Sequence, residues 1–356
     1  MLKSRRSRLM TFFAEYSLDA VLFTDLRNIR YLCGFTGSEG ALLITRDHAW
    51  FLCDSRYSVQ ASEEVQGAEV RECGAVRIET IASLAQEHSL VRIGFEAAHT
   101  TVSAFRRMSV KLSGIELVEL DSALDEIRIC KDVAEIEQLA AVAALSSQSL
   151  AAVLDNVKPG VRELDIALAL EFEMRRRGAD GIAFDFIVAS GVRGALPHGR
   201  ASDKVIQSGE LITIDFGALK DGYHSDETVT IACGEPVSRA REIHAIVKSA
   251  HDRAIEAVKP GISCKDLDEV ARSYIRDKGY GDYFGHGLGH GVGLEIHEMP
   301  SLSPRSSAIL EEGMVVTIEP GIYIPGFGGV RIEDTVVVTG DGCRILTGAN
   351  KELLVL

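Results

Sequence analysis

The sequence lacks paired cysteines, long apolar runs and any excess of positive charge, and each absence argues against a class of protein. Its seven cysteines are odd in number, scattered and without a C-x-x-C pair, which argues against a disulfide framework or a zinc ribbon. A net charge of −14 argues against a nucleic-acid partner, because clustered Lys and Arg drive such binding. No stretch approaches the ~18 uninterrupted apolar residues of a membrane span, and no apolar run of secretory length precedes Glu15. We therefore expect a cytoplasmic protein with neither nucleic acid nor membrane as a partner.

The length of 356 residues fits two domains. In the first part of the chain, short apolar runs bounded by turn residues alternate with helix-like segments, which is typical of an α/β layer fold. The composition becomes charged around residues 121–132, and a long helix rich in Ala, Leu and Glu is expected from Val133. We predict an N-terminal α/β domain over residues 1–128 and a second domain over residues 129–356. The predicted strands of the first domain lie at residues 19–24, 40–45, 49–53 and 91–95.

The second domain contains one short sequence motif twice, and an acidic residue occupies the same position in both copies. Residues 209–217 and 313–321 share their glycine spacing, a Thr-Ile pair and a carboxylate, and the match continues in residues 226–229 and 333–336. Burying an ionised carboxylate costs several kcal/mol unless it is paired, and few Lys or Arg lie near these strands. Two divalent cations would neutralise the acids. The alternative, that all of them face solvent on alternating strands, is less favoured at matched places in a repeat. The matched acids are Asp215, Asp226, Glu319 and Glu333.

A further repeat indicates that the whole second domain is duplicated. The turn sequence Val-Lys-Pro-Gly occurs at residues 157–160 and 258–261, and each copy opens a helical stretch that ends at a glycine, Gly178 or Gly279. A glycine after a basic residue is typical of a helix C-terminus. We expect two α+β halves facing each other, with a site on the pseudo-two-fold axis between them.

Histidines and glycines alternate between the two pairs of acids. The segment 285–298 contains His286, His290 and His297, and its glycines make a helix costly at about 1 kcal/mol each relative to Ala. An extended or looped backbone is therefore expected. His198 lies on a predicted turn just before the first acidic strand. A single histidine is usually structural, but three within this glycine-rich segment favour a site.

Oxygen-rich ligation with one imidazole suits Mn²⁺, Co²⁺ or Fe²⁺, with Zn²⁺ also possible. Two such cations about 3.5–4 Å apart can activate a shared water and polarise a carbonyl together. These residue types in this arrangement indicate hydrolytic chemistry.

The run from His286 to Glu298, with the four acids in the same order, resembles the signature of the Xaa-Pro peptidases, aminopeptidase P and prolidase. These belong to the pita-bread group, which includes methionine aminopeptidase and creatinase. Residues 28–37 and 54–57 are similar to the creatinase-type N-terminal domain. The resemblance thus implies a creatinase-type N-terminal α/β domain followed by a duplicated α+β pita-bread catalytic domain.

The resemblance also implies roles for individual residues around two divalent metal ions per subunit, with Mn²⁺ preferred over Co²⁺, Fe²⁺ or Zn²⁺. Glu319 would carry a proton as well as bind metal, and Tyr323 and Arg331 would line the substrate site. The implied metal ligands are Asp215, Asp226, His290, Glu319 and Glu333. The implied catalytic residues are His198, His286, His297 and Glu319.

Two departures from the family pattern bear on activity. Residues 228–230 read Thr-Val-Thr where relatives often have Thr-Arg-Thr, which removes a charge near the metals. Prolidases commonly carry an arginine shortly after the His-Glu of the signature, whereas this chain has Ser301, with Arg305 as the nearest cation.

The absent arginine favours an Xaa-Pro aminopeptidase that releases the first residue from peptides with proline second, and the alternative is an Xaa-Pro dipeptidase. A creatinase-like amidinohydrolase and a catalytically silent peptide-binding module remain as less favoured readings. The resemblance further implies a homodimer.

Overall fold

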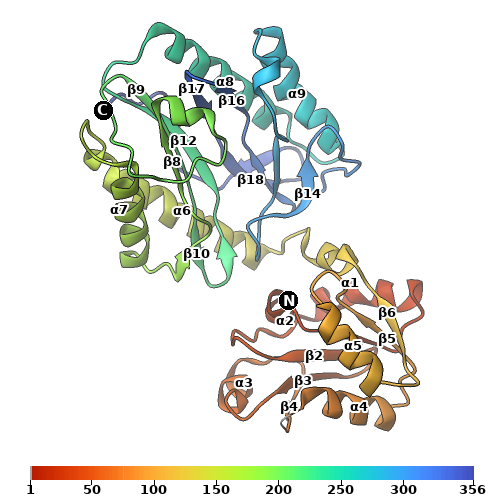
Figure 1. The fold of residues 1–356 in the computed structure, drawn as a ribbon. Helices are drawn as coiled ribbons and strands as arrows, with labels where there is room; N and C mark the ends of the chain where they lie inside the picture. Colours follow the sequence, from red (N-terminus) through yellow and green to blue (C-terminus); the bar gives the residue numbers. More distant parts are fainter. Residues whose placement is uncertain (1, 75) are drawn as a thin grey trace. The chain divides into compact units, whose positions relative to one another are not determined.

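The structure is a computed structural model that describes residues 2–74 and 76–356. The chain divides into two compact units, of which unit 1 runs to Arg128 and unit 2 comprises Ile129–Leu356 (Figure 1).

Unit 1 is built on a six-stranded sheet with the order β4-β3-β2-β1-β5-β6. Strand β1 pairs antiparallel with β2, and β2 pairs antiparallel with β3, whereas the β1–β5, β5–β6 and β3–β4 pairs are parallel. All four strands expected from the sequence are present. The two edge strands, β4 and β6, begin and end with charged residues and were not expected, because neither forms an apolar run. The strands are β1 (Ala20–Phe23), β2 (Ala41–Thr45), β3 (Ala49–Cys53), β4 (Glu69–Glu72), β5 (Arg92–Phe95) and β6 (Glu116–Glu119).

Helices cover this sheet and bury its apolar side chains. Leu22, Leu43 and Trp50 of the sheet pack in one cluster with Ile81 and Leu84 of α4, and all five are buried. This α/β arrangement is the one predicted for the first domain. The helices are α1 (Leu2–Glu15), α2 (Leu26–Cys33), α3 (Ser58–Glu64), α4 (Arg77–Glu87), α5 (Val102–Lys111) and the 3₁₀ helix η1 (Ser122–Arg128).

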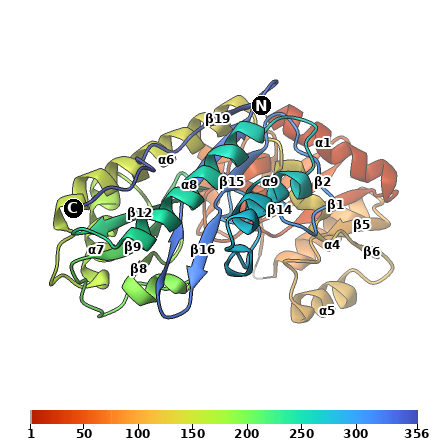
Figure 2. The ribbon, with the colours of Figure 1, turned by 90° about the horizontal axis from the view of Figure 1, so that it is seen from above.

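Unit 2 contains two helix pairs, one from each half of the sequence repeat. Helix α6 packs on α7, and α8 packs on α9 (Figures 1 and 2). Helices α7 and α9 are followed by Gly178 and Gly279 with positive φ values of 95° and 85°, which only glycine adopts readily, as the repeated sequence predicted. The helices are α6 (Val133–Val153), α7 (Glu163–Arg176), α8 (Ser238–Ala257) and α9 (Cys264–Asp277), with 3₁₀ helices η2 (Leu154–Asn156), η3 (Gly191–Ala195) and η4 (Gly281–Tyr283).

One helical stretch among the described residues, 133–156, is long and apolar enough to cross a membrane by composition alone. Most of this stretch is helix α6, which contacts α7 and strands β10 and β11 within unit 2. Its residues Leu139, Val142 and Leu150 are buried. These contacts are those of a core helix in a folded domain.

The strands of unit 2 form two main sheets that bring the two halves together. The first has the order β12-β9-β8, and the second has the order β14-β13-β15-β18-β19. Smaller sheets are β11-β10-β7 and the β16-β17 hairpin. The strands of the first half are β7 (Gly181–Ile182), β8 (Ile187–Ser190), β9 (Glu210–Phe216), β10 (Ala218–Lys220), β11 (Tyr223–His224) and β12 (Glu227–Cys233). Those of the second are β13 (Gly289–Gly291), β14 (Glu298–Leu302), β15 (Val315–Ile318), β16 (Gly321–Ile324), β17 (Gly328–Arg331), β18 (Asp334–Val338) and β19 (Cys343–Ile345).

The two main sheets meet beside the acids of the repeat. Thr228 and Glu333 form an antiparallel bridge, in which the Glu333 N–H donates to the Thr228 carbonyl at 3.1 Å. The Thr335 hydroxyl donates to the Asp226 carbonyl at 2.7 Å, so each half holds the other half's acidic segment. The duplicated α+β catalytic fold expected from the sequence is therefore present.

Candidate metal centre

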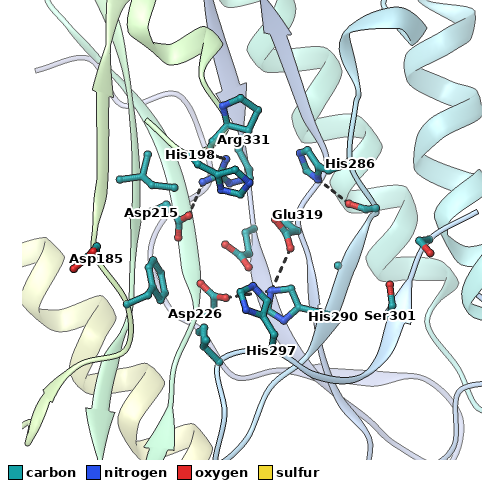
Figure 3. A pocket seen from close by; sticks show the side chains of 18 of the residues that line it. Asp185, His198, Asp215, Asp226, His286, His290, His297, Ser301, Glu319 and Arg331 are labelled. Atoms are coloured by element: carbon teal, nitrogen blue, oxygen red, sulfur yellow. Dashed lines mark hydrogen bonds and ion pairs between the residues drawn. The ribbon is translucent and has the colours of Figure 1, made fainter. Parts of the chain in front are cut away.

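A cavity of about 540 Å³ in unit 2 gathers the acids and histidines identified in the sequence. Figure 3 shows Asp215, Asp226, Glu319 and His290 pointing toward one another, with three further imidazoles around them. Apolar lining comes from Phe184, Ile187, Pro197 and Ile296, and Asp185, Arg200, Ser301 and Ser303 also line the cavity. The predicted residues that line it are Asp215, Asp226, Glu319, Glu333, His198, His286, His290, His297 and Arg331.

The acids come from strand ends that the repeat places symmetrically. Asp215 lies near the end of β9, and Asp226 directly precedes β12. Glu319 directly follows β15, and Glu333 directly precedes β18, so each half contributes one acid from each of two neighbouring strands. His290 lies in β13, within the glycine-rich segment that was expected to be extended.

The side chains approach closely enough to hold a cation. His290 Nε2 lies 3.5 Å from Asp226 Oδ2 and 3.4 Å from Glu319 Oε1. One ligand atom from each of Asp226, His290 and Glu333 lies within 4.8 Å of the others. Asp215 Oδ1 is buried and has no hydrogen-bond partner among the described residues. A buried carboxylate oxygen without a donor fits a site that a cation completes.

The pKa shifts of the acids also indicate a cation site. Burial, followed by repulsion from Glu333 and Asp215, raises the pKa of Asp226 well above its usual value. Burial and the neighbouring acids also raise the pKa of Glu333, and burial raises the pKa of Glu319 to about 7. Such shifts mean that the ionised cluster lacks sufficient positive charge, which bound divalent cations would supply.

His290 is held in the state that a metal ligand needs. Burial lowers its pKa, which favours the neutral ring. Its Nδ1 is 3.0 Å from the Gly291 carbonyl, so the N–H at Nδ1 donates there and Nε2 faces the acids with a free lone pair. Thr317 accepts from the His290 backbone N–H at 3.0 Å and donates to Glu319 Oε1 at 3.3 Å. Thr317 belongs to the repeated Thr-Ile pair, which was the available sequence signal for this contact.

The other three imidazoles differ in what their nitrogens contact. His286 Nδ1 lies 2.8 Å from the Gly287 carbonyl, and its Nε2 lies 2.9 Å from the Tyr323 hydroxyl, so both ring nitrogens are engaged. Burial lowers the pKa of His286 to about 4, which keeps this ring neutral. Within the described chain, no hydrogen bond occupies a ring nitrogen of His198 or His297. These two rings are therefore open to a ligand in the cavity.

Arg331, on β17, holds Asp215 in place. Its Nη2 donates to Asp215 Oδ2 at 2.5 Å, its Nε donates to the Thr228 hydroxyl at 3.2 Å, and its Nη1 donates to the Tyr323 hydroxyl at 2.9 Å. The guanidinium is thus largely occupied by the protein, and Tyr323 lies behind His286, outside the residues that line the cavity.

A cation does lie beside the Thr-Val-Thr segment, because the Arg331 Nε donates to the Thr228 hydroxyl. Val229 pairs with Ile214 in the β9–β12 ladder, one position from Thr228. Alternation along the strand therefore turns Val229 away from Arg331.

Comparison with known proteins agrees with this geometry. The family model described as "Metallopeptidase family M24" matches residues 137–340, and the model described as "Creatinase/Prolidase N-terminal domain" matches residues 5–130. The Xaa-Pro dipeptidase of Pyrococcus furiosus is 41% identical, with 99% of this chain and 100% of that protein covered.

Two solved structures cover nearly the whole chain. The Xaa-Pro dipeptidase from Bacillus anthracis has a TM-score of 0.98 and 42% identity over 100% of both chains. The X-Pro aminopeptidase from Thermotoga maritima MSB8 has a TM-score of 0.92 and 41% identity over 96% of this chain and 98% of that one. The predicted combination of a creatinase-type N-terminal domain and a pita-bread catalytic domain is confirmed. Membership of a metallopeptidase family implies divalent metal ions, for which the carboxylate and imidazole cluster is the candidate site. The chain belongs to metallopeptidase family M24.

Proposed function

We propose that this protein is an Xaa-Pro dipeptidase whose divalent cations are held by the buried acid and imidazole cluster of unit 2. The observation that carries the proposal is the convergence of Asp226, His290 and Glu333 within 4.8 Å, in a chain similar along its full length to named Xaa-Pro dipeptidases. The sequence favoured the aminopeptidase, but these relatives support the dipeptidase better. The proposed metal ligands are Asp215, Asp226, His290, Glu319 and Glu333.

The number of acids supports two cations per subunit, and their oxygen-rich set supports Mn²⁺, with Co²⁺, Fe²⁺ or Zn²⁺ as alternatives. When bound, the cations would supply Lewis acidity that polarises the scissile carbonyl and makes a water more acidic.

The protein side chains would move the proton and stabilise the developing charge. Glu319 lines the cavity beside His290 and would accept a proton from the water and pass it on. His198 and His297 have ring nitrogens free to donate to the carbonyl oxygen as its negative charge develops. His286 is engaged by Gly287 and Tyr323, and its proposed part is to shape this wall of the cavity.

The cavity lining suits a proline-containing substrate. The peptide bond before proline lacks an N–H, so recognition cannot use that donor. Phe184, Ile187, Pro197 and Ile296 offer apolar contact area. Ser301 and Ser303 offer hydroxyl donors. These groups support a small peptide with proline in the second position as the substrate.

The second candidate, an Xaa-Pro aminopeptidase, is favoured by one observation. Ser301 lines the cavity where prolidases commonly have an arginine, and Arg305 is not among the lining residues. A longer peptide has no carboxylate at that position and needs no arginine there.

A comparison of peptide lengths separates the two candidates. The chelated protein should regain activity on titration with Mn²⁺, and kcat/KM should be at least tenfold higher for Ala-Pro than for Ala-Pro-Ala. Preference for the tripeptide would name the aminopeptidase instead. Full activity after exhaustive chelation would contradict the metal-dependent reading, and creatine hydrolysis would indicate the amidinohydrolase.

Replacing His198 with Ala should lower kcat by about 10²-fold, because one donor to the developing oxyanion is lost. Mn²⁺ affinity, measured by calorimetry, should stay within twofold of wild type. His198→Gln retains an N–H donor and should recover part of the rate. His224→Ala is the matched control, since His224 does not line the cavity. Equal rates for the two alanine variants would remove His198 from the mechanism.

We also propose a homodimer, as the family resemblance implies, and a cytoplasmic location. All seven cysteines are free thiols, which suits a reducing compartment. Sedimentation of the purified protein and cell fractionation test the two statements.

A further inference from the structure

Each of two proposed metal ligands is followed by a second acid that faces the other way. Asp226 and Glu333 line the cavity, whereas the next residues, Glu227 and Asp334, do not. Successive side chains on a strand point to opposite faces, so Glu227 and Asp334 lie behind the cluster. Glu227 is 0% exposed and Asp334 is 5% exposed, which makes them buried charges without a direct part in the proposed chemistry.

One lysine connects these two acids. Lys351 lies after the last strand and is buried with them. Its Nζ contacts Glu227 Oε1 and lies 3.2 Å from Asp334 Oδ1. Burial alone would lower the pKa of Lys351, but attraction to both acids outweighs burial and raises it, so the ammonium group stays charged.

The first acid is fully satisfied by its surroundings. The Ser147 hydroxyl of α6 donates to Glu227 Oε2 at 2.6 Å, and the Ala349 N–H donates to Oε1 at 2.8 Å. Both oxygens of Glu227 therefore have partners.

The second acid is satisfied in a parallel way from the other half. The Thr347 hydroxyl donates to Asp334 Oδ1 at 2.5 Å, and His251 Nε2 of α8 lies 3.2 Å from Oδ2. Helices α6 and α8 therefore hold equivalent acids in the two halves. Lys351 contacts both acids and so links one half to the other.

Stability alone does not account for this arrangement. A buried ion cluster typically adds little net stability over apolar side chains of similar volume, because desolvation offsets the attraction. The acids on the cavity side, Asp226 and Glu333, come from opposite halves and repel each other without cations. Holding Glu227 and Asp334 together on the far face opposes that separation.

We infer that Lys351 is a positioning residue, which bridges Glu227 and Asp334 and thereby sets the spacing of Asp226 and Glu333 for cation binding. The inference rests on the proposed metal centre. It assigns a part in metal binding to a residue outside the cavity.

Calorimetric titration of the chelated protein with Mn²⁺ tests this role. Lys351→Met should bind Mn²⁺ at least tenfold more weakly than wild type, and Lys351→Arg should recover part of the affinity. Lys131→Met is the matched control, because Lys131 and Glu298 form another buried pair in unit 2, with Nζ 3.0 Å from Oε2. The control should lose thermal stability but keep its Mn²⁺ affinity within twofold.

Lys351→Met leaves two buried acids without their cation and can therefore unfold the protein, so a second variant without these charges is needed. The triple variant Lys351→Met, Glu227→Gln, Asp334→Asn removes those uncompensated charges and keeps the shapes of the side chains. Weak Mn²⁺ binding by the folded triple variant supports the positioning role. Wild-type Mn²⁺ affinity in the Lys351→Met variant or in the triple variant overturns it. Failure of the wild-type protein itself to bind Mn²⁺ would instead overturn the proposed metal centre.

Discussion

Replacing Asp226 with Asn is expected to abolish the peptidase while making the metal-free protein more stable. Asp226 is 6% exposed, and its burial, followed by repulsion from Glu333, Asp215 and Glu319, raises its pKa. Removing the charge deprives a cation of a ligand, and kcat/KM should fall by at least about 10³-fold. The same change removes repulsion from the metal-free cluster, which should stabilise it by about 1–3 kcal/mol.

Thermal melting with and without saturating Mn²⁺ measures both effects. The metal-free Asp226→Asn protein should melt a few degrees above metal-free wild type, and the stabilisation that Mn²⁺ gives to wild type should disappear. Asp185→Asn is the control for metal binding, since Asp185 lines the same cavity but its side chain is 61% exposed and paired with Arg200. Undiminished Mn²⁺ binding by Asp226→Asn would contradict the ligand assignment.

The metal-free protein is expected to lose stability as pH rises from about 6.5 to 8.5. Glu319 has a pKa raised to about 7, and the pKa values of Asp226 and Glu333 are raised as well. An acid with a raised pKa in the folded state contributes stability that is complete below its unfolded pKa. That contribution disappears as pH rises through the folded pKa. The expected loss over this range is on the order of 1–3 kcal/mol, since one pKa unit corresponds to about 1.4 kcal/mol.

Histidines oppose this trend at lower pH. Burial lowers the pKa of His286 to about 4. Below about pH 6.5, therefore, His286 binds a proton in the unfolded chain but remains neutral in the folded chain. This contribution falls as pH drops below about 6.5, whereas that of the acids rises toward their unfolded pKa values, so the two partly cancel there and the net loss should be clearest above about pH 6.5.

Denaturant titration of chelated protein across pH measures this profile. Saturating Mn²⁺ should abolish the loss above pH 6.5, because protons and cations compete for the same oxygens. Glu333→Gln isolates the contribution of one acid. A metal-free wild type that grows more stable up to pH 8.5 would refute the electrostatic description of the cluster.

The acids of the site could be predicted because the chain is duplicated. A repeat places equivalent side chains at equivalent strand positions, so Asp215 and Glu319, or Asp226 and Glu333, identify each other without any structure. The glycine-rich segment likewise predicted an extended backbone around His290, and β13 lies there.

Contacts between segments far apart in the chain could not be predicted. Arg331 was expected to line the substrate site and it lines the cavity, but its hydrogen bond to Asp215 could not be foreseen, because no pattern in the sequence specifies that pairing. Lys351 has a single copy and no repeat partner, so nothing near it marked its contact with Glu227. The absence of an arginine shortly after the His-Glu of the signature favoured the aminopeptidase, whereas the named relatives support the dipeptidase better.

The contact of Lys351 with Glu227 has a consequence for how the enzyme matures. The carboxylates beside Glu227 are translated well over a hundred residues before this lysine, and β12 also gains a bridge from Ala232 to Val355. A nascent chain on the ribosome thus cannot complete the cluster until residues 351–355 have emerged. Premature termination near residue 345 should therefore yield a polypeptide that has every proposed ligand but binds Mn²⁺ weakly.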